Sequence, residues 1–423
     1  MRISTAQFIS NGAQAITDQQ ADLVKTQSQM SSGLAVLTPS DDPLAANLIL
    51  KFEQEITISE RYIEIGGAAE GLVSLEETTL NSMTDLLNRI RDLMISGGNG
   101  NYSQLDRQAI AEEVQALLDE AIGLANTQTA SGEYLFSGFQ LLTQPYTMDA
   151  TGAVIYNGDQ GQRTARVNDS VVLATSDPGY DIFDNVLNGN GIIQIFDEPT
   201  NTGTGVIDPG SVNTANYTDE TYTISFVTNS DDELAYNVFD SAGTQIIPAP
   251  PLDPVLDAVT YTEGEDIIIN NEVTTNITGT PSDTANANNP NPLYGDFFTI
   301  APSSKQSVFV TIQNAVDALL LPQNNESEQA EFQNAMNRVL MDIDRNMENI
   351  DRIRSSLGAR LNAIQNEIYV NQDLIIAISI DLSRVRDLDY VEATTRLTAQ
   401  ITSLEAAQAS FARVQNLSLF NFL

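Results

Sequence analysis

The residues of this 423-residue chain that could do chemistry are mainly carboxylates. Two short acidic runs stand out, Asp231-Asp232-Glu233 and Glu263-Gly264-Glu265-Asp266. Either run could bind Ca²⁺ or supply the acid pair of a glycosidase. Neither has the ligand spacing of an EF-hand loop, and acidic residues at turns are usually just solvated. We therefore predict no catalytic residue, no cofactor and no metal site.

The composition excludes most other kinds of site. Cys, His and Trp are absent, which removes disulfides, thiol nucleophiles, Ser-His-Asp triads and zinc sites with nitrogen or sulfur ligands. Only three lysines are present, Lys25, Lys51 and Lys305, which argues against Schiff-base chemistry. The glycine-rich run at 97–101 has no lysine or strand beside it, so it predicts a turn rather than a phosphate-binding loop. We do not expect an enzyme.

Charge and hydropathy limit the partners. The chain has 19 Lys and Arg against 57 Asp and Glu, a net charge of −38. This charge repels phosphate backbones and anionic lipid surfaces, so we expect neither nucleic acid nor a membrane as a partner. The longest apolar runs are too short to span a bilayer, and residues 1–30 lack the apolar core of a secretory signal. We expect a soluble chain.

Composition also divides the chain into three parts. Twelve of the fifteen prolines lie between Pro145 and Pro302, whereas the flanks are rich in Ala, Leu, Gln and Glu with a helical apolar period. We predict a mainly α rod, a long antiparallel helical bundle or coiled coil from both chain ends, with an inserted antiparallel β domain. The expected parts are terminal coiled-coil assembly helices at 1–40 and 388–423, a helical rod domain at 41–145 and 303–387, and an outer β domain at 146–302.

Breakers and caps define the expected helices. Two prolines four residues apart, Pro39 and Pro43, must end the first helix. Asp41 and Asp42 are expected to cap the next helix, from about 44 to 96, and Ser103 with Asp106 predicts the N-cap of a third. A short helix should end at Pro322, and a long one should cover 326–386. The apolar stripe then shifts phase near 387–389.

Short alternating segments fill the middle of the chain. Residues 221–226 and 234–239 alternate apolar and polar side chains, and 267–269, 273–277 and 297–300 are further strand candidates. Their regular spacing, without helices between them, predicts an antiparallel sheet closed into a small sandwich or barrel.

The two chain ends carry weak apolar heptads. In both, glutamine fills some of the expected seam positions, at Gln20, Gln27 and Gln408. Two such helices of about 35 residues would form a marginal pair, so we predict that they become ordered mainly against copies or neighbours. The residues expected at this assembly interface are Ile9, Ile16, Leu23 and Met30 against Leu397, Ile401, Leu404 and Phe411, together with Phe420 and Phe422.

Several motifs resemble those of the flagellin superfamily. They are Pro39-Ser40-Asp41-Asp42-Pro43, Asp106-Arg107 and Leu357-Gly358-Ala359-Arg360-Leu361-Asn362. Other segments resemble one family of this superfamily, the hook–filament junction proteins (hook-associated protein 3). They are residues 132–138, 156–159, 179–183, 295–298 and the ending 416–423 with its two phenylalanines. The resemblance covers about residues 1–185 and 295–423 and is weakest over 190–290.

This resemblance implies a secreted structural protein without catalysis. It implies export without a cleaved signal peptide, with an export chaperone before secretion, to the extracellular part of the bacterial flagellum. At the hook–filament junction the family forms a ring of copies, eleven by the arrangement of the superfamily, between hook-associated protein 1 and flagellin.

Two other functions stay open at this point. A filament flagellin shares the superfamily motifs, but it polymerises into long tubes whereas a junction protein needs a template. An adhesin or carbohydrate-binding module carried on the β insert would present aromatic side chains to its ligand. The strands near Tyr222, Tyr236 and Tyr261 supply the contact candidates for such a module.

Overall fold

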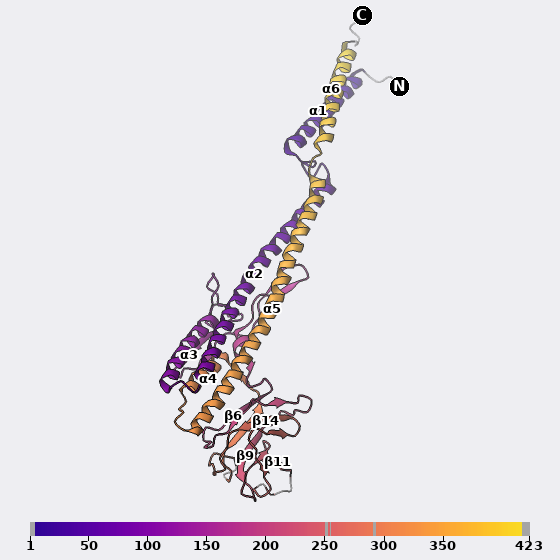
Figure 1. The fold of residues 1–423 in the computed structure, drawn as a ribbon. Helices are drawn as coiled ribbons and strands as arrows, with labels where there is room; N and C mark the ends of the chain where they lie inside the picture. The colour runs from indigo at the N-terminus through magenta and orange to yellow at the C-terminus, as the bar shows by residue number, and fades with distance from the viewer. Residues whose placement is uncertain (1–4, 250–252, 254, 291–292, 417–423) are drawn as a thin grey trace. The chain divides into compact units, whose positions relative to one another are not determined.

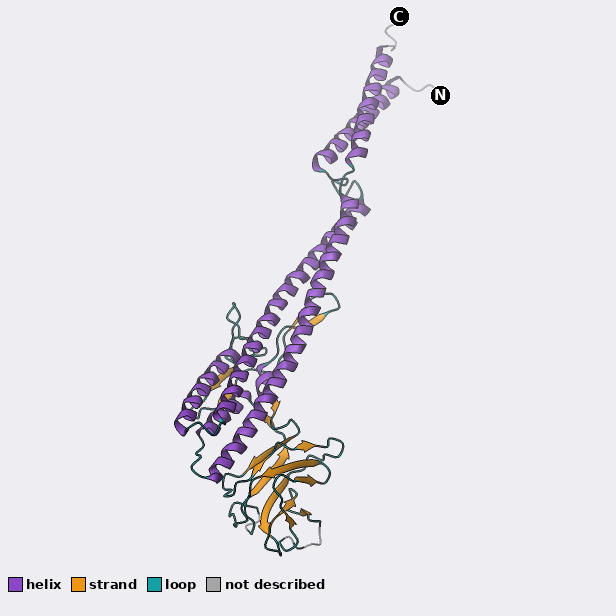
Figure 2. Cartoon of the chain, viewed as in Figure 1, coloured by secondary structure: helices purple, strands orange, loops and turns teal. Residues whose placement is uncertain are grey.

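The computed structural model describes the chain except for residues 1–4, 250–252, 254, 291–292 and 417–423. Helices lie towards both chain ends and antiparallel sheets lie between them in sequence, which confirms the predicted fold class (Figure 2). The chain forms two compact units. The first comprises Met1–Gly67, Arg166–Val171 and Gln365–Leu423, and the second Ala68–Ala165 and Val172–Ile364. The three-part division expected from composition stays a prediction.

Five of the six described helices begin and end near the signals expected from the sequence, but the expectation that Pro39 and Pro43 end the first helix was wrong. The helix bounds are α1 (Thr5–Ser32), α2 (Pro43–Gly97), α3 (Gln104–Ala125), α4 (Val308–Leu320), α5 (Glu326–Arg386) and α6 (Tyr390–Asn416). The first helix, α1, already ends at Ser32, because Gly33 takes a left-handed conformation with φ +75°. The predicted cap of α3 is a full capping box, because the Ser103 side chain accepts the N–H of Asp106 while the Asp106 carboxylate accepts the N–H of Ser103. The break between α5 and α6 falls where the apolar stripe shifts phase.

In the second unit, α2 and α5 run antiparallel. Arg354 Nη2 of α5 lies 2.9 Å from Glu77 Oε1 of α2, and Arg91 Nε of α2 lies 2.8 Å from Asp344 Oδ1 of α5. The later residue of α2 therefore pairs with the earlier residue of α5, as in an antiparallel pair. Their facing stripes are buried and α3 packs on α4. The fully buried stripe of α2 contains Leu80, Met83, Leu87, Ile90 and Met94. A 3.6-residue apolar period therefore produces this helical core.

A charged cluster is buried beside that core. Arg360 Nη2 lies 2.5 Å from Asp177 Oδ2, and the two side chains are 13% and 11% exposed. The N–H of Asp177 donates to Glu76 Oε1 at 3.1 Å. Burial raises the pKa of Glu76 well above its ordinary value, and the nearby Asp177 carboxylate adds to the shift. Arg360 thus holds a carboxylate that would otherwise be buried without a counter-charge.

Gly358, two residues before this arginine, has an ordinary helical conformation. A Cβ added there would meet no atom within 4 Å, although its neighbour Leu357 is fully buried. Glycine costs a helix interior roughly 0.5–1 kcal/mol relative to alanine. We expect Gly358→Ala to raise the free energy of unfolding of the isolated chain by about that amount, measured by urea denaturation. A loss of stability would mean that glycine is needed for packing within the chain.

The described strands and one π-helical turn lie between α3 and α4. Their bounds are β1 (Tyr146–Met148), β2 (Val154–Tyr156), β3 (Thr164–Arg166), β4 (Val172–Ala174), η1 (Tyr180–Asp184), β5 (Val186–Leu187), β6 (Ile193–Asp197), β7 (Val206–Ile207), β8 (Ser211–Val212), β9 (Tyr222–Thr228), β10 (Leu234–Phe239), β11 (Gln245–Ile247), β12 (Val259–Thr260), β13 (Asp266–Ile269), β14 (Val273–Thr278), β15 (Phe297–Pro302) and β16 (Lys305–Gln306).

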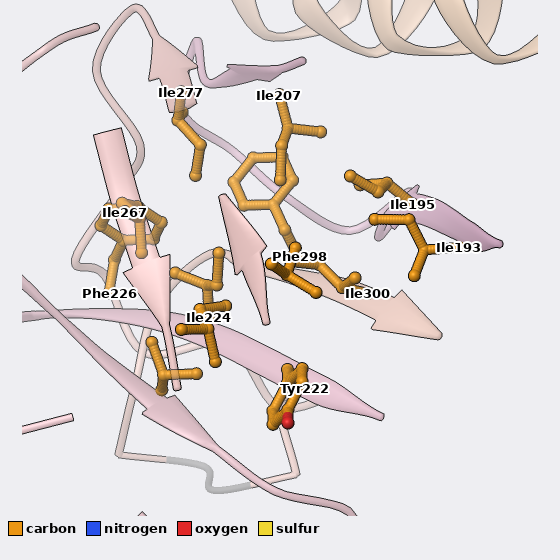
Figure 3. Packing of buried hydrophobic residues seen from close by; sticks show 13 residues of the cluster. Ile193, Ile195, Ile207, Tyr222, Ile224, Phe226, Ile267, Ile277, Phe298 and Ile300 are labelled. Carbon is orange, nitrogen blue, oxygen red and sulfur yellow. The ribbon is translucent and has the colours of Figure 1, made fainter. Parts of the chain in front are cut away.

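Two antiparallel sheets share one apolar core. One sheet has the strand order β11-β10-β9-β15-β6 with β12 beside β10, and the other has β13-β14-β7 with β8 beside β14. The fully buried side chains of Ile224 and Phe226 from the first sheet and Ile277 from the second belong to the same cluster (Figure 3). Of the two predicted forms, the structure has the sandwich.

The segments that lead into and out of this sandwich lie side by side. β5 pairs with β16, with Leu187 opposite Lys305 and Val186 opposite Gln306. Beyond the pair, the N–H of Asn188 donates to Ser304 O at 3.0 Å, and the N–H of Ser304 donates to Asn188 Oδ1 at 2.9 Å. The sandwich is therefore an insertion whose two ends meet.

Just before β5, Asp184 lies in a largely apolar environment. Burial raises its pKa to about 6, although the Tyr146 hydroxyl donates to it at 2.6 Å. Between pH 4 and 6 the folded state then holds a proton that the unfolded state releases, so this group makes stability fall as pH rises. We expect Asp184→Asn to reduce that fall, measured by urea denaturation at pH 4, 5 and 6. An unchanged pH dependence would contradict the assignment.

Candidate assembly interface on the paired terminal helices

Within the first unit, α1 and α6 lie side by side in antiparallel orientation (Figure 1). The Tyr390 hydroxyl, at the start of α6, donates to the carbonyl of Met30 near the end of α1 at 3.2 Å. Further along, Gln19 Nε2 donates to Ser403 Oγ at 3.0 Å. Residues separated by several hundred positions in sequence thus form one helix pair.

The apolar seam between these helices is only half covered. The predicted interface residues are half-buried on both helices, namely Ile16, Leu23 and Met30 of α1 and Leu397, Leu404 and Phe411 of α6. Among the described residues of α1 and α6, Ala393 is the one apolar side chain that is fully buried. A core residue normally touches neighbours on all sides, so this pair leaves its larger side chains partly in contact with water.

The alternate seam positions differ from those predicted. Gln20, Gln27 and Gln408 are exposed, and the seam instead includes Gly12, Gln19 and Thr26 of α1 with Gln400 and Ala407 of α6. A heptad seam alternates steps of three and four residues, so Leu23 is compatible with two registers. One register places Gln20 and Gln27 on the seam, and the other places Gln19 and Thr26 there. Packing decides between them, since a Cβ on Gly12 would lie 2.9 Å from Cδ2 of the Phe411 ring.

These alternate positions weaken the pair further. Gln19 Oε1 and Gln400 Oε1 are buried without a hydrogen-bond partner among the described residues. A buried polar atom without a partner costs about 1–3 kcal/mol, so a glutamine layer reduces the stability of the seam. Neither residue was singled out from the sequence, where they would have been recognised only by testing the second heptad register.

One predicted interface residue faces away from the seam. Ile401 is 40% exposed, and two further apolar residues of the pair are more exposed, Val24 at 59% and Val391 at 78%. The backbone of Ile9 belongs to α1, but its side chain is not described, and Phe420 and Phe422 lie outside the described residues. The terminal pair therefore has apolar side chains that its own two helices do not cover.

The segment that follows α1 is hydrogen-bonded to the segment that precedes α6. The N–H of Ala35 donates to Arg386 O at 2.8 Å, and the N–H of Leu388 donates to Gly33 O at 2.9 Å. Gly33 has φ +75°, which favours glycine. Asp389 then caps α6, since its Oδ1 accepts the N–H of Val391 at 2.8 Å. The chain leaves α1 and enters α6 through one hydrogen-bonded junction.

The two aspartates between the prolines have different roles, and the prediction that both cap α2 was wrong for Asp41. Asp42 is the cap, because its Oδ1 accepts the N–H groups of Leu44 and Ala45, both at 3.0 Å. Asp41 instead lies 2.7 Å from Lys25 Nζ on α1. The lysine, with the N–H of Thr38, lowers the pKa of Asp41 to about 2. Pro39 and Ser40 are exposed in the turn, and Pro43 begins α2.

The other motif residues support the helices of the second unit. Asp106 completes the capping box of α3. Arg107 is 3% exposed, with its guanidinium carbon 5.3 Å from the centre of the Phe332 ring and Nη1 donating to Tyr102 O at 3.2 Å. Leu361 is half-buried and Asn362 is exposed. Asp106 and Arg107 therefore have structural roles.

The acidic runs lie at turns in the structure, except that Asp266 is the first residue of β13. Asn229 Oδ1 accepts the N–H groups of Asp231 and Glu233, both at 3.0 Å, in the turn between β9 and β10, and Glu263 Oε1 accepts the N–H of Gly279 at 2.8 Å. In the part of the chain that the structure describes, no three acidic side chains are close enough together to hold a metal ion. No described helix is both long and apolar enough to cross a membrane.

The tyrosines considered as ligand contacts are engaged inside the sandwich. Tyr222 is 1% exposed and its hydroxyl donates to Glu272 Oε2 at 2.9 Å. Tyr261 donates its hydroxyl to Ile277 O at 2.8 Å, and Tyr236 packs half-buried against the core. Their rings are therefore not an open platform on which a sugar could stack.

Two family models match the chain, and with the terminal helix pair they define a flagellin-type protein. They are the bacterial flagellin N-terminal helical region over residues 3–140 and the bacterial flagellin C-terminal helical region over 340–423. The solved flagellar hook-associated protein 3 of Legionella pneumophila has a TM-score of 0.74 and 33% identity, covering 80% of this chain and 98% of that one. The chain belongs to the flagellar hook-associated protein 3 family of the flagellin superfamily, as its motifs indicated.

Two curated relatives show how the similarity is distributed. Flagellar hook-associated protein 3 of Salmonella typhimurium is 32% identical over 186 residues, which span 44% of this chain and 58% of that protein's length. Flagellin D of Vibrio anguillarum is 26% identical over 430 residues, covering 98% of this chain and 96% of that protein.

Proposed function

We propose that this chain is a structural adaptor that joins the flagellar hook to the filament. The observation that carries the proposal is the α1–α6 seam, whose larger side chains are half-buried and whose neighbours Ile401 and Val24 are exposed. Apolar area left in water by a marginal pair is stabilised when neighbouring helices cover it. The membership in the hook-associated protein 3 family supports the location at the hook.

The partners follow from the same proposal. On one side the adaptor contacts hook-associated protein 1, and on the other side it contacts flagellin. Copies of the chain form a ring, of eleven subunits by the superfamily arrangement, and residues 1–40 and 388–423 make the contacts between them. The chain reaches the outside of the cell by export without a cleaved signal peptide, and an export chaperone binds it before secretion.

A deletion strain tests this function. Without the gene, we expect intact hooks, no filament, and flagellin monomers shed into the medium, because the filament has nothing to attach to. Expression of the full chain should restore filaments. Filaments of normal length in the deletion strain would contradict the adaptor function.

A filament flagellin is the second candidate, since the similarity to Flagellin D of Vibrio anguillarum extends over 98% of this chain. Purified chain at high concentration distinguishes the two functions. A flagellin should polymerise alone into long tubes visible by electron microscopy, whereas an adaptor should stay monomeric or form short rings. A carbohydrate-binding function has lost its contact candidates, because Tyr222 and Tyr261 are engaged in the sandwich.

A further inference from the structure

A cleft in the second unit lies between α4, α5 and β6, away from the terminal helices in sequence. Its volume is about 610 Å³, which falls within the range of about 300–1,000 Å³ typical of ligand pockets. Its apolar lining comes from all three elements and the residues after β6. These side chains are Phe196, Pro199, Ala318, Leu321, Ala335 and Val339.

Charged residues line the same cleft, and they are unbalanced. Four carboxylates, those of Asp197, Glu198, Asp317 and Glu331, face a single base, Arg338. That base is already engaged, because Arg338 Nη1 lies 2.8 Å from Asp197 Oδ1 and its guanidinium carbon lies 5.9 Å from the centre of the Phe196 ring. The remaining carboxylates give the cleft a negative potential.

Glu331 is the carboxylate of this cleft whose pKa is raised. Burial raises its pKa, the carboxylates of Asp197 and Glu328 add to the shift, and Arg338 opposes it. No described residue forms a hydrogen bond or salt bridge with it. A partly desolvated carboxylate beside an apolar floor is stabilised by a cation that brings its own hydrocarbon stem.

We propose that this cleft docks an arginine side chain of a partner polypeptide, with Glu331 as its counter-charge. A guanidinium is more weakly hydrated than an ammonium and binds carboxylates through two parallel hydrogen bonds, so it loses less on entering a half-buried site. Its alkyl stem packs on the half-buried Leu321. The cleft is larger than one side chain, so the apolar residue next to the arginine packs on Phe196 and Pro199.

Binding of short peptides to the full chain at low salt tests this inference. The probe is the capped tripeptide Leu-Arg-Leu, and its control is the same peptide with citrulline, which keeps the shape of arginine without its charge. Isothermal titration should show binding of the arginine peptide and at least about tenfold weaker binding of the citrulline peptide. Glu331→Gln should weaken binding of the arginine peptide about fivefold or more.

A matched variant separates contact from general charge. Glu326→Gln removes an equal charge from an exposed position on the first turn of α5, outside the cleft, and should change the affinity less than about twofold. Equal weakening by both variants, equal affinity for the citrulline peptide, or no binding of the arginine peptide would overturn the proposal. So would spermidine that binds as tightly as the peptide and is weakened equally by Glu331→Gln, since the site would then select small amines.

Discussion

Aspartate at both Leu23 and Leu404 is expected to abolish filament attachment in cells and to separate α1 from α6 in the isolated chain. Both leucines are half-buried on the seam, and a charge there has neither a counter-charge nor full solvation. A fully buried leucine contributes on the order of 1.5–3 kcal/mol and a half-buried one less, but a pair with glutamines in its seam has little stability to lose. Protease should then cleave residues 5–32 rapidly, while most of the helical circular dichroism remains.

The exposed glutamines of the same helices provide the control. Gln20→Asp with Gln408→Asp adds the same charges one helix face away from the seam, so the pair should keep its resistance to protease. If the Leu23 and Leu404 variant still builds functional filaments, the seam is not the assembly surface. If both variants open the pair equally, net charge rather than seam packing controls it.

Removal of the buried guanidinium is expected to produce the largest loss of stability. Arg360→Ala leaves Asp177, 11% exposed, without the guanidinium that pairs with it, beside the fully buried Glu76. Breaking a buried pair by removing one partner typically costs about 3–5 kcal/mol. Urea denaturation followed by circular dichroism should show that the free energy of unfolding of the second unit falls by about that amount.

A second arginine on α5 calibrates this result. Arg354 pairs with Glu77, but the two side chains are 25% and 34% exposed, so Arg354→Ala should cost about 1 kcal/mol or less. Equal losses for Arg354→Ala and Arg360→Ala would show that burial of the Asp177 pair does not determine its contribution.

The helix ends could be predicted from the sequence because their signals are local. Pro43, the Ser103–Asp106 box and the proline-free stretch over 326–386 act within a few residues of the ends they define. The short strands were predictable for the same reason, since Tyr222, Ile224 and Phe226 alternate within one strand.

What the sequence left open depends on contacts between distant residues. Asp41 occupies a capping position in the sequence, but in the structure its carboxylate pairs with Lys25 of α1, sixteen residues earlier in the chain. The heptads allowed two registers, and Gly12 against Phe411 selects one. The strand order is similar, because β15 joins β6 to β9 in one sheet and only the folded chain brings those strands together.

The paired β5 and β16 strands have a consequence for how the molecule can change over evolution. Neighbouring strands lie about 4.8 Å apart, so Leu187 and Lys305 stand close enough for a tight turn to connect them. The whole sandwich can then be shortened, enlarged or exchanged as a cassette without displacing the helices on which it is mounted. Chimaeras joined at this strand pair are the natural design for replacing the insert with a foreign domain.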